Sequence, residues 1–271
     1  MPVTDTARGP VWRRRTRGEV LLRWFGWLLG VAVFVVCWQR ISDATTWFFV
    51  EDAPRIAADI GSRAFPPRWT YLSTLWKPLW DTLNIATLGT LLALVLAVPI
   101  AFLAARNTTP SVLFVRPLAL LVIVASRSIN SLIWALLLVA IIGPGVLAGL
   151  LAIALRSIGF CGKLLYEAIE EIDHRQVEAV TATGASRWQV MLVGIVPQIM
   201  PTFAGVTVFR WDINIRESTV LGLVGAGGIG LELQSSLNVL AWPQVTLILL
   251  VILLAVIVSE WVSARVRGAI I

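Results

Sequence analysis

The chain has 271 residues; 58% of them are hydrophobic, 14% are charged, and the formal net charge is +6. Soluble domains carry about a quarter charged residues, so this composition excludes a soluble protein and indicates an integral membrane protein. The apolar runs are continuous and about 20 residues long, which predicts spanning helices, not the short alternating strands of a barrel. The expected fold class is an all-α polytopic membrane protein with about six transmembrane helices.

The positive charge is concentrated before and at the start of the first apolar run, in Arg13, Arg14, Arg15, Arg17 and Arg23. Such clusters orient membrane proteins, so no nucleic-acid partner is expected. Cys37 and Cys161 lie within apolar runs and His174 is the sole histidine, so we predict neither a metal site nor a disulfide. The first apolar run lacks a convincing cleavage site and is expected to remain as an anchor.

Three regions follow from the order of polar and apolar segments. Residues 1–20 are predicted to form a flexible, basic, cytoplasmic arm. Residues 21–80 are expected to contain the first span, at about 21–38, and an extracytoplasmic part with two short amphipathic segments at the membrane surface. Residues 81–267 are the predicted transmembrane core, which includes a cytoplasmic loop over residues 167–197.

Five further spans are expected within the core, at about residues 82–105, 112–142, 146–165, 197–216 and 243–262. Residues 127–130 interrupt the second of these, over residues 112–142, and Gly143-Pro144-Gly145 turns the chain after it. A glycine-rich connector over residues 217–241 links the last two. Six spans place both termini on one side, which the positive-inside rule makes cytoplasmic.

A polar segment, EAVTATGASRWQVMLVGIVPQIMP over residues 178–201, separates two long apolar runs. Gly184 permits a tight turn between two short helices, and Pro197 is expected to end the second. One interpretation is an amphipathic hairpin resting on lipid headgroups. Because acidic residues lie just upstream and the inner leaflet is anionic, docking into a groove of a soluble partner is favoured.

Polar and charged residues also occur where the bilayer penalises them, namely at Arg127, Asn130, Asp212, Asn214, Arg216 and Glu217. One interpretation is a structural ion pair between Asp212 and Arg216 near the outer interface, with Arg210 extending to that interface. The alternative is a path for an anion, which guanidinium groups bind by paired hydrogen bonds.

Residues 225–230 match the dinucleotide-binding pattern GxGxxG. The strand–turn–helix context and the downstream acid of that motif are missing, so the pattern predicts a tight re-entrant turn instead. The sequence has no Walker lysine motif, and any ATP would therefore be bound by another subunit.

The spacing of Glu178, Ala179, Gly184 and Pro197 resembles the EAA signature of ABC-importer permeases. The copy differs in its tail, where Gly194 and Val196 replace an isoleucine and a leucine. Four further stretches, residues 65–72, 82–107, 127–137 and 209–230, resemble the phosphonate-importer permeases in particular. Closely similar permeases are associated with phosphite and related anions.

This resemblance implies a type I ABC-importer permease fold and the transmembrane subunit of an ATP-driven importer in the bacterial cytoplasmic membrane. It implies a homodimer of permeases, two cytoplasmic ATPase subunits that hold ATP and magnesium, and an extracytoplasmic binding protein. No catalytic residue, cofactor or metal is expected in this chain. The implied coupling residues are Glu178, Ala179, Gly184, Arg187 and Pro197.

Alternatives to a phosphonate importer remain open at this level. Within the same class, the solute could be phosphite, phosphate or another small molecule such as methionine or a quaternary amine. An ion-coupled secondary carrier would need a titratable acid at mid-membrane and usually an internal repeat, and no convincing repeat is present. A membrane scaffold without transport activity is the remaining alternative.

Overall fold

The structure, a computed structural model, describes residues 3–6, 9–12 and 17–270. The chain divides into two compact units, residues 1–61 and 62–271. Apart from a short antiparallel hairpin of β1 (Val3–Thr6) and β2 (Gly9–Trp12), the regular structure in the described residues is helical. The predicted all-α fold class is thereby confirmed. Part of the arm predicted to be flexible forms this hairpin.

The first unit contains α1 (Arg17–Ala44) and most of α2 (Trp47–Ala64). Most side chains along α1 are apolar and exposed, as expected for a span that faces lipid. In α2, polar and apolar residues alternate with the helical period and no residue is buried. The sequence predicted two short amphipathic segments over residues 39–80. The structure has one amphipathic helix of 18 residues, because the helical pattern continues through Pro54.

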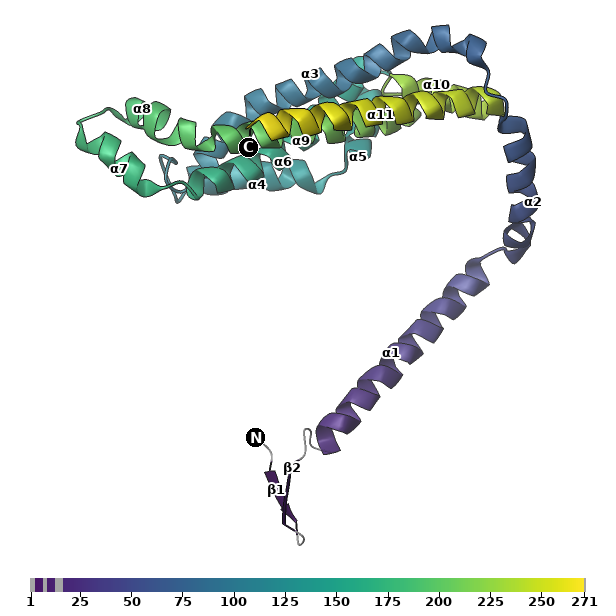
Figure 1. Cartoon of the computed structure of the whole chain (residues 1–271), viewed down its shortest axis with the longest axis horizontal. Coiled ribbons are helices and arrows are strands. Elements are labelled where there is room, and N and C mark those ends of the chain that lie inside the picture. Colours follow the sequence, from purple (N-terminus) through teal and green to yellow (C-terminus); the bar gives the residue numbers. More distant parts are fainter. Residues whose placement is uncertain (1–2, 7–8, 13–16, 271) are drawn as a thin grey trace. The chain divides into compact units, whose positions relative to one another are not determined.

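The second unit is a helical bundle (Figure 1). Its elements are η1 (Trp69–Tyr71), α3 (Leu72–Ala104), α4 (Val115–Ser128), α5 (Ser131–Ile142), α6 (Val146–Glu170), α7 (His174–Ala182), α8 (Arg187–Gln189), the π-helical segment η2 (Val190–Ile195), α9 (Val196–Leu221), η3 (Gly222–Val224), α10 (Ile229–Asn238) and α11 (Trp242–Ile270). In Figure 1, α7 and α8 extend from one end, and α10 lies near the other.

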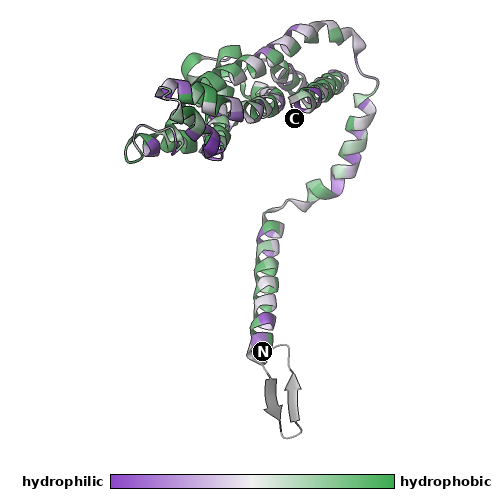
Figure 2. Ribbon diagram, turned by 60° about the vertical axis from the view of Figure 1, so that its left-hand side comes forward, coloured by the Kyte–Doolittle hydropathy of each residue, from purple (hydrophilic) through white to green (hydrophobic). Residues whose placement is uncertain are grey.

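Five helices in the described residues are long and apolar enough to span a membrane, or six when the bent pair α4–α5 is one span. The predicted number of about six spans is confirmed. Hydrophobic residues dominate the bundle helices in Figure 2. Most of the bundle surface is therefore suited to hydrocarbon or to another protein.

Small residues allow the central helices to approach closely. A Cβ added to Gly89 on α3 would lie 2.9 Å from the Ile153 side chain of α6. A Cβ added to Gly159 on α6 would lie 2.5 Å from the Ile123 carbonyl oxygen of α4. Membrane helices associate largely through such packing, because lipid gives no hydrophobic reward for burial.

The structure changes the start of the second predicted span and shows the shape of the third. The second span begins at Leu72, ten residues before the predicted start, because Leu75 packs in a buried cluster with Leu247 and Ile248 of α11. The predicted interruption within residues 112–142 is confirmed, since α4 and α5 meet at an angle of 89°. Asn130 caps α5 there by accepting a hydrogen bond from the Leu132 amide at 3.1 Å.

The prediction that Pro197 ends a short helix was wrong. Pro197 occupies the first turn of α9, directly after the π-helical segment η2. Proline lacks the amide hydrogen that a regular helix would use here, and it stands where the bonding pattern changes from π-helical to α-helical. The chain from Arg187 to Val224 therefore runs as one continuous helical rod of 38 residues.

The predicted tight turn between the last two spans is confirmed, and we call residues 222–230 the glycine turn. Gly225, Gly227 and Gly228 have positive φ angles there. The Ile229 amide donates to Thr82 Oγ1 at 2.8 Å, and the Gly145 amide donates to the Gly225 carbonyl at 3.0 Å. The connector is shorter than predicted, because α10 occupies residues 229–238.

Candidate functional site

The polar segment of the sequence folds as a compact helical hairpin, residues 174–195, which we call the polar hairpin. Asp173 caps α7 by accepting from the Arg175 amide at 2.9 Å. Gly184 turns the chain with a φ of +80°, a left-handed conformation that side chains disfavour. Ser186 and Gln189 then form a capping box at α8. The hairpin therefore carries its own start, turn and restart signals.

One amide, that of Gln198 on α9, ties together the two ends of the polar hairpin. Its Oε1 accepts from the Asp173 amide at 2.9 Å. Its Nε2 donates to the Gly194 carbonyl at 2.6 Å and to the Asp173 carbonyl at 3.4 Å. Gly194, which departs from the expected EAA tail, is buried and faces Val177 of α7.

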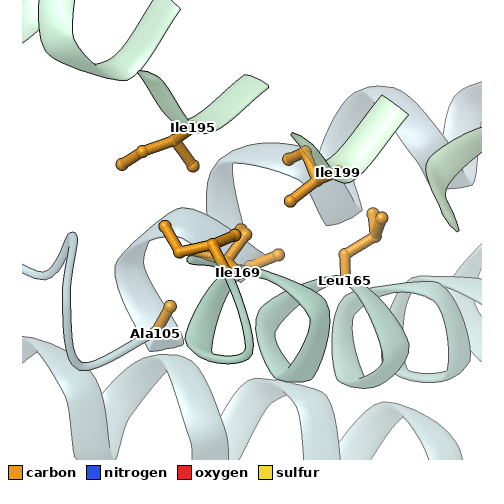
Figure 3. Packing of buried hydrophobic residues seen from close by; sticks show 7 residues of the cluster. Ala105, Leu165, Ile169, Ile195 and Ile199 are labelled. Atoms are coloured by element: carbon orange, nitrogen blue, oxygen red, sulfur yellow. The ribbon is translucent and has the colours of Figure 1, made fainter. Parts of the chain in front are cut away.

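We call these hydrogen bonds of Gln198 the clamp, and an apolar cluster lies next to them. Ile195 and Ile199 pack on Leu165 and Ile169 of α6 and on Ala105, which follows α3 (Figure 3). Next to it, the Arg116 guanidinium pairs with Glu170 at 3.4 Å and donates to the Ala104 carbonyl at 3.0 Å. The base of the polar hairpin is therefore fixed to three helices of the bundle.

The outer surface of the polar hairpin is open. The structure places the five residues predicted for coupling on or beside the hairpin, and all of them are exposed: Glu178, Ala179, Gly184, Arg187 and Pro197. Trp188 is 72% exposed, although tryptophan is normally largely buried. A hollow of about 710 Å³ separates the hairpin from residues 107–110 and is lined in part by Arg187 and Trp188. Glu178 lies within α7, whose N-terminal cap is Asp173, so Glu178 does not cap this helix.

A second polar assembly is partly buried between α6, α9 and the start of α5. We call it the arginine cluster: Arg156, Arg210 and Glu217 with Asn130, Ser131 and Ser157. Arg210 is 2% exposed, and its Nε donates to Ser157 Oγ at 2.9 Å. The Arg210 guanidinium lies 3.4 Å from one Glu217 oxygen, and the Arg156 guanidinium lies 3.6 Å from the other. The expectation that Arg210 reaches the interface was wrong, because its partners are inside the bundle.

The arginine cluster continues into neighbouring helices through neutral groups. Arg156 donates to Asn130 Oδ1 and to Ser131 Oγ, each at 3.4 Å. Asn214 donates to Thr90 Oγ1 of α3 at 2.7 Å and to Ser157 Oγ at 3.2 Å. Three of the six predicted pathway residues, Asn130, Asn214 and Glu217, are thus brought into one network.

The other three predicted pathway residues lie elsewhere. Asp212 and Arg216 form the predicted ion pair on α9, and Asp212 also accepts from Ser259 of α11 at 2.9 Å. Arg127 is exposed at the end of α4, and its side chain makes no hydrogen bond or ion pair within the described residues. The structure therefore divides the predicted set into the arginine cluster, an α9–α11 pair and an isolated arginine.

Residues 97–269 match the family described as "Binding-protein-dependent transport system inner membrane component". The match covers more than half of the chain, including the polar hairpin and the arginine cluster. The chain belongs to this family. It is therefore a multi-span permease of the bacterial inner membrane.

The permease is similar to the phosphite transport system permease protein PtxC of Stutzerimonas stutzeri, with 42% identity over 236 residues that cover 87% of this chain and 84% of that one. It is 43% identical over 205 residues to the phosphate-import permease protein PhnE of Mycolicibacterium smegmatis, covering 76% of this chain and 38% of that one. The sequence-based assignment to ABC-importer permeases of the phosphonate type is confirmed.

Among solved structures, an inward-facing form of the MetNI methionine ABC transporter matches with a TM-score of 0.65 and 18% identity. The match covers 75% of this chain and 99% of that one. At this identity the likeness concerns the fold, and it confirms the predicted ABC-importer permease architecture.

Sequence reasoning missed three residues of the permease: Arg156, Arg210 as a buried residue, and Gln198. A signal existed for Arg156, because it is the sole charge in the first sixteen residues of α6 and lies near the middle of a span. Gln198 carried no signal in the sequence. Its role depends on the return of the chain to Asp173, 25 residues away.

Proposed function

We propose that the permease forms half of the translocation pathway of an ATP-driven importer for phosphonates or related phosphorus oxyanions. The observation that carries this proposal is the polar hairpin, which is exposed on its outer surface and fixed at its base to three helices. Its rigid base and its exposed Arg187 and Trp188 suit docking into a groove of another protein. The names of the phosphite and phosphate relatives support the substrate class.

We propose the partners that this class of importer implies. Two copies of the permease would enclose the path, with each polar hairpin in a groove of one cytoplasmic ATPase subunit. Those subunits would hold ATP and magnesium, and a separate extracytoplasmic binding protein would deliver the anion. Both termini of the permease would be cytoplasmic, on the same side as the polar hairpin.

The continuous helix from the polar hairpin gives coupling a physical route. Gln198 at the hairpin base and Arg210 in the arginine cluster lie twelve residues apart on α9, which corresponds to roughly 18 Å of helix. A displacement of the hairpin by its ATPase partner would move α9 and the charges it bears. Such a shared two-state element is what coupling between ATP and substrate requires.

The anion would pass residues that can donate hydrogen bonds at membrane depth. We propose the six predicted positions as lining or support of this path: Arg127, Asn130, Asp212, Asn214, Arg216 and Glu217. Among them, Asn130 and Glu217 contact Arg156 in the arginine cluster, and Asn214 supports it through Ser157. Guanidinium groups are well suited to phosphorus oxyanions because they bind them through paired donors.

The test is purification of the tagged permease from its host in mild detergent, with mass spectrometry of the proteins that elute with it. We expect an ATPase and an extracytoplasmic binding protein, and we expect that binding protein to take up phosphite, phosphate or a phosphonate. Elution as a homo-oligomer without an ATPase would refute the proposed coupling role of the hairpin. A binding protein that binds methionine instead would refute the substrate class.

A further inference from the structure

The arginine cluster has an unusual balance of charge for a partly buried site. Two guanidinium groups, from Arg156 and Arg210, share the single carboxylate of Glu217. The hydrogen-bond partners of the two guanidinium groups other than Glu217 are Asn130, Ser131 and Ser157, which are neutral. The cluster therefore carries a net charge of +1 in a part of the chain where an uncompensated charge is costly.

The contacts of Glu217 are also long for charge-assisted hydrogen bonds. Each of its oxygens approaches one guanidinium, at 3.4 and 3.6 Å, and neither arginine is bound bidentately. A well-formed pair between arginine and a carboxylate has two parallel bonds of roughly 2.7 to 2.9 Å. The carboxylate therefore lies between two donors without saturating either of them.

The cluster is open on one side. Arg210 is locked in place by Ser157, Glu217 and the ring of Phe160, which lies 5.1 Å from its guanidinium carbon. By contrast, the Arg156 side chain is 31% exposed and the Glu217 side chain 18% exposed. Arg156 is ten residues into α6, roughly 15 Å along the helix, so its open side is near mid-membrane. Because hydrocarbon penalises an exposed guanidinium there, we expect this side to face a water-filled path.

Resting on the proposed function, we propose that Arg156 and Arg210 form an anion site within the membrane, in which Glu217 occupies the place of the transported anion. A phosphorus oxyanion has more oxygens than a carboxylate and carries up to two negative charges, so it satisfies both guanidinium groups better than Glu217 does. The displaced carboxylate stays nearby and repels the anion. This repulsion makes binding of the anion transient, as passage through a pore requires.

Glu217 and Arg156 then have separable effects. Without the carboxylate, an anion would enter the cluster more readily and leave it more slowly. Without Arg156, the net positive charge and the open half of the site are lost. Arg210 is unsuitable for the first test, because removing a buried arginine leaves Glu217 and Ser157 without their partner and endangers folding.

The experiment measures retention of radiolabelled phosphite by the purified permease–ATPase complex without its binding protein, so that the signal comes from the membrane part. We expect Glu217→Gln to increase retention about tenfold, as the loss of one charged competitor predicts. Adding Arg156→Gln to this variant should abolish the gain. Unchanged retention in Glu217→Gln, or a gain that survives Arg156→Gln, would overturn the proposal.

Uptake into proteoliposomes that contain the complete importer gives the second measurement. Arg156→Gln should lower uptake about tenfold or more. Arg156→Lys should lower uptake less, because lysine keeps the positive charge but lacks the paired donors of a guanidinium group. Lys163→Gln, two helical turns away on α6 in an exposed pair with Glu167, is the matched control and should leave uptake unchanged. Copurification of the ATPase confirms that each variant is folded.

The two proposals fail in different ways. If the unmodified importer takes up phosphite but Arg156→Gln does so equally well, the anion site is wrong and the proposed function stands. If the unmodified importer takes up neither phosphite, phosphate nor methylphosphonate, the proposed substrate class is wrong. Retention of phosphite by Glu217→Gln still decides the site in that case, since it does not depend on transport.

Discussion

At the scale of single residues, substitutions of Gly184 can distinguish backbone strain within the permease from a steric clash with a partner. Its φ of +80° disfavours any side chain, at a cost of roughly 1–2 kcal/mol. Yet nothing lies within 4 Å of a Cβ added at this position. A bulky residue therefore fits within the chain itself, and a steric effect of its size must come from another molecule.

We predict that Gly184→Trp inserts and purifies normally but separates ATP hydrolysis from uptake, because the indole occupies the groove into which the hairpin docks. Gly184→Ala and Gly184→Asn are the controls, since alanine introduces the backbone strain alone and asparagine tolerates positive φ. Both should retain most of the uptake, measured together with ATPase activity in proteoliposomes. Equal loss in all three variants would attribute the effect to the backbone and not to docking.

At the scale of elements, the clamp formed by Gln198 determines how firmly the polar hairpin is attached. Gln198→Ala removes three hydrogen bonds that join the two ends of the hairpin. We expect faster hydrogen–deuterium exchange over residues 173–198 and reduced uptake, while the ATPase remains bound. Thr202→Ala, one turn further along α9 at an exposed position, should leave both measurements unchanged. Unaltered exchange in Gln198→Ala would mean that the apolar cluster alone fixes the hairpin.

The glycine turn depends on direct contact between two stretches of backbone. A Cβ added to Gly230 would lie 1.9 Å from the Thr219 carbonyl oxygen and 2.9 Å from Gly222 Cα. Gly230→Ala should therefore lower the melting temperature of the purified protein, with a cost of about 1–3 kcal/mol from overpacking. Gly205→Ala on α9 is the control, because nothing lies within 4 Å of its added Cβ. Equal melting temperatures for the two variants would contradict this packing.

The same elements show which parts of the structure the sequence determines locally. The spans, the break at Asn130 and the turn at Gly184 were predictable, because each depends on neighbouring residues and their pattern. The effect of Pro197 was not, since a proline can follow one helix or begin the next, and the π-helical segment before it decided the outcome. Arg210 was misplaced for a different reason: its partner Ser157 is 53 residues away. The sequence pattern of one helix does not identify the residue on another helix that a buried polar side chain will contact.

At the scale of the whole molecule, the proposed topology places the polar hairpin and the glycine turn on opposite sides of the membrane. In Figure 1, α7 and α8 lie at one end of the bundle, and α10, which begins within the glycine turn, lies near the other. Arg106, Arg175 and Arg187 lie at the hairpin end, which the positive-inside rule assigns to the cytoplasm. An even number of spans then leaves both termini on that side, where the proposed ATPase subunits would dock.

Single cysteines test this topology in a background of Cys37→Ser and Cys161→Ser. We predict that Asn238→Cys, exposed at the end of α10, reacts with a membrane-impermeant maleimide on intact spheroplasts. Ala179→Cys, exposed on α7, should react only after the membrane is permeabilised. The reverse pattern would place the polar hairpin outside the cell, where no ATP-hydrolysing subunit could reach it, and the proposed coupling would fail. Labelling of both cysteines on sealed spheroplasts would instead contradict an arrangement in which the bundle separates these two ends.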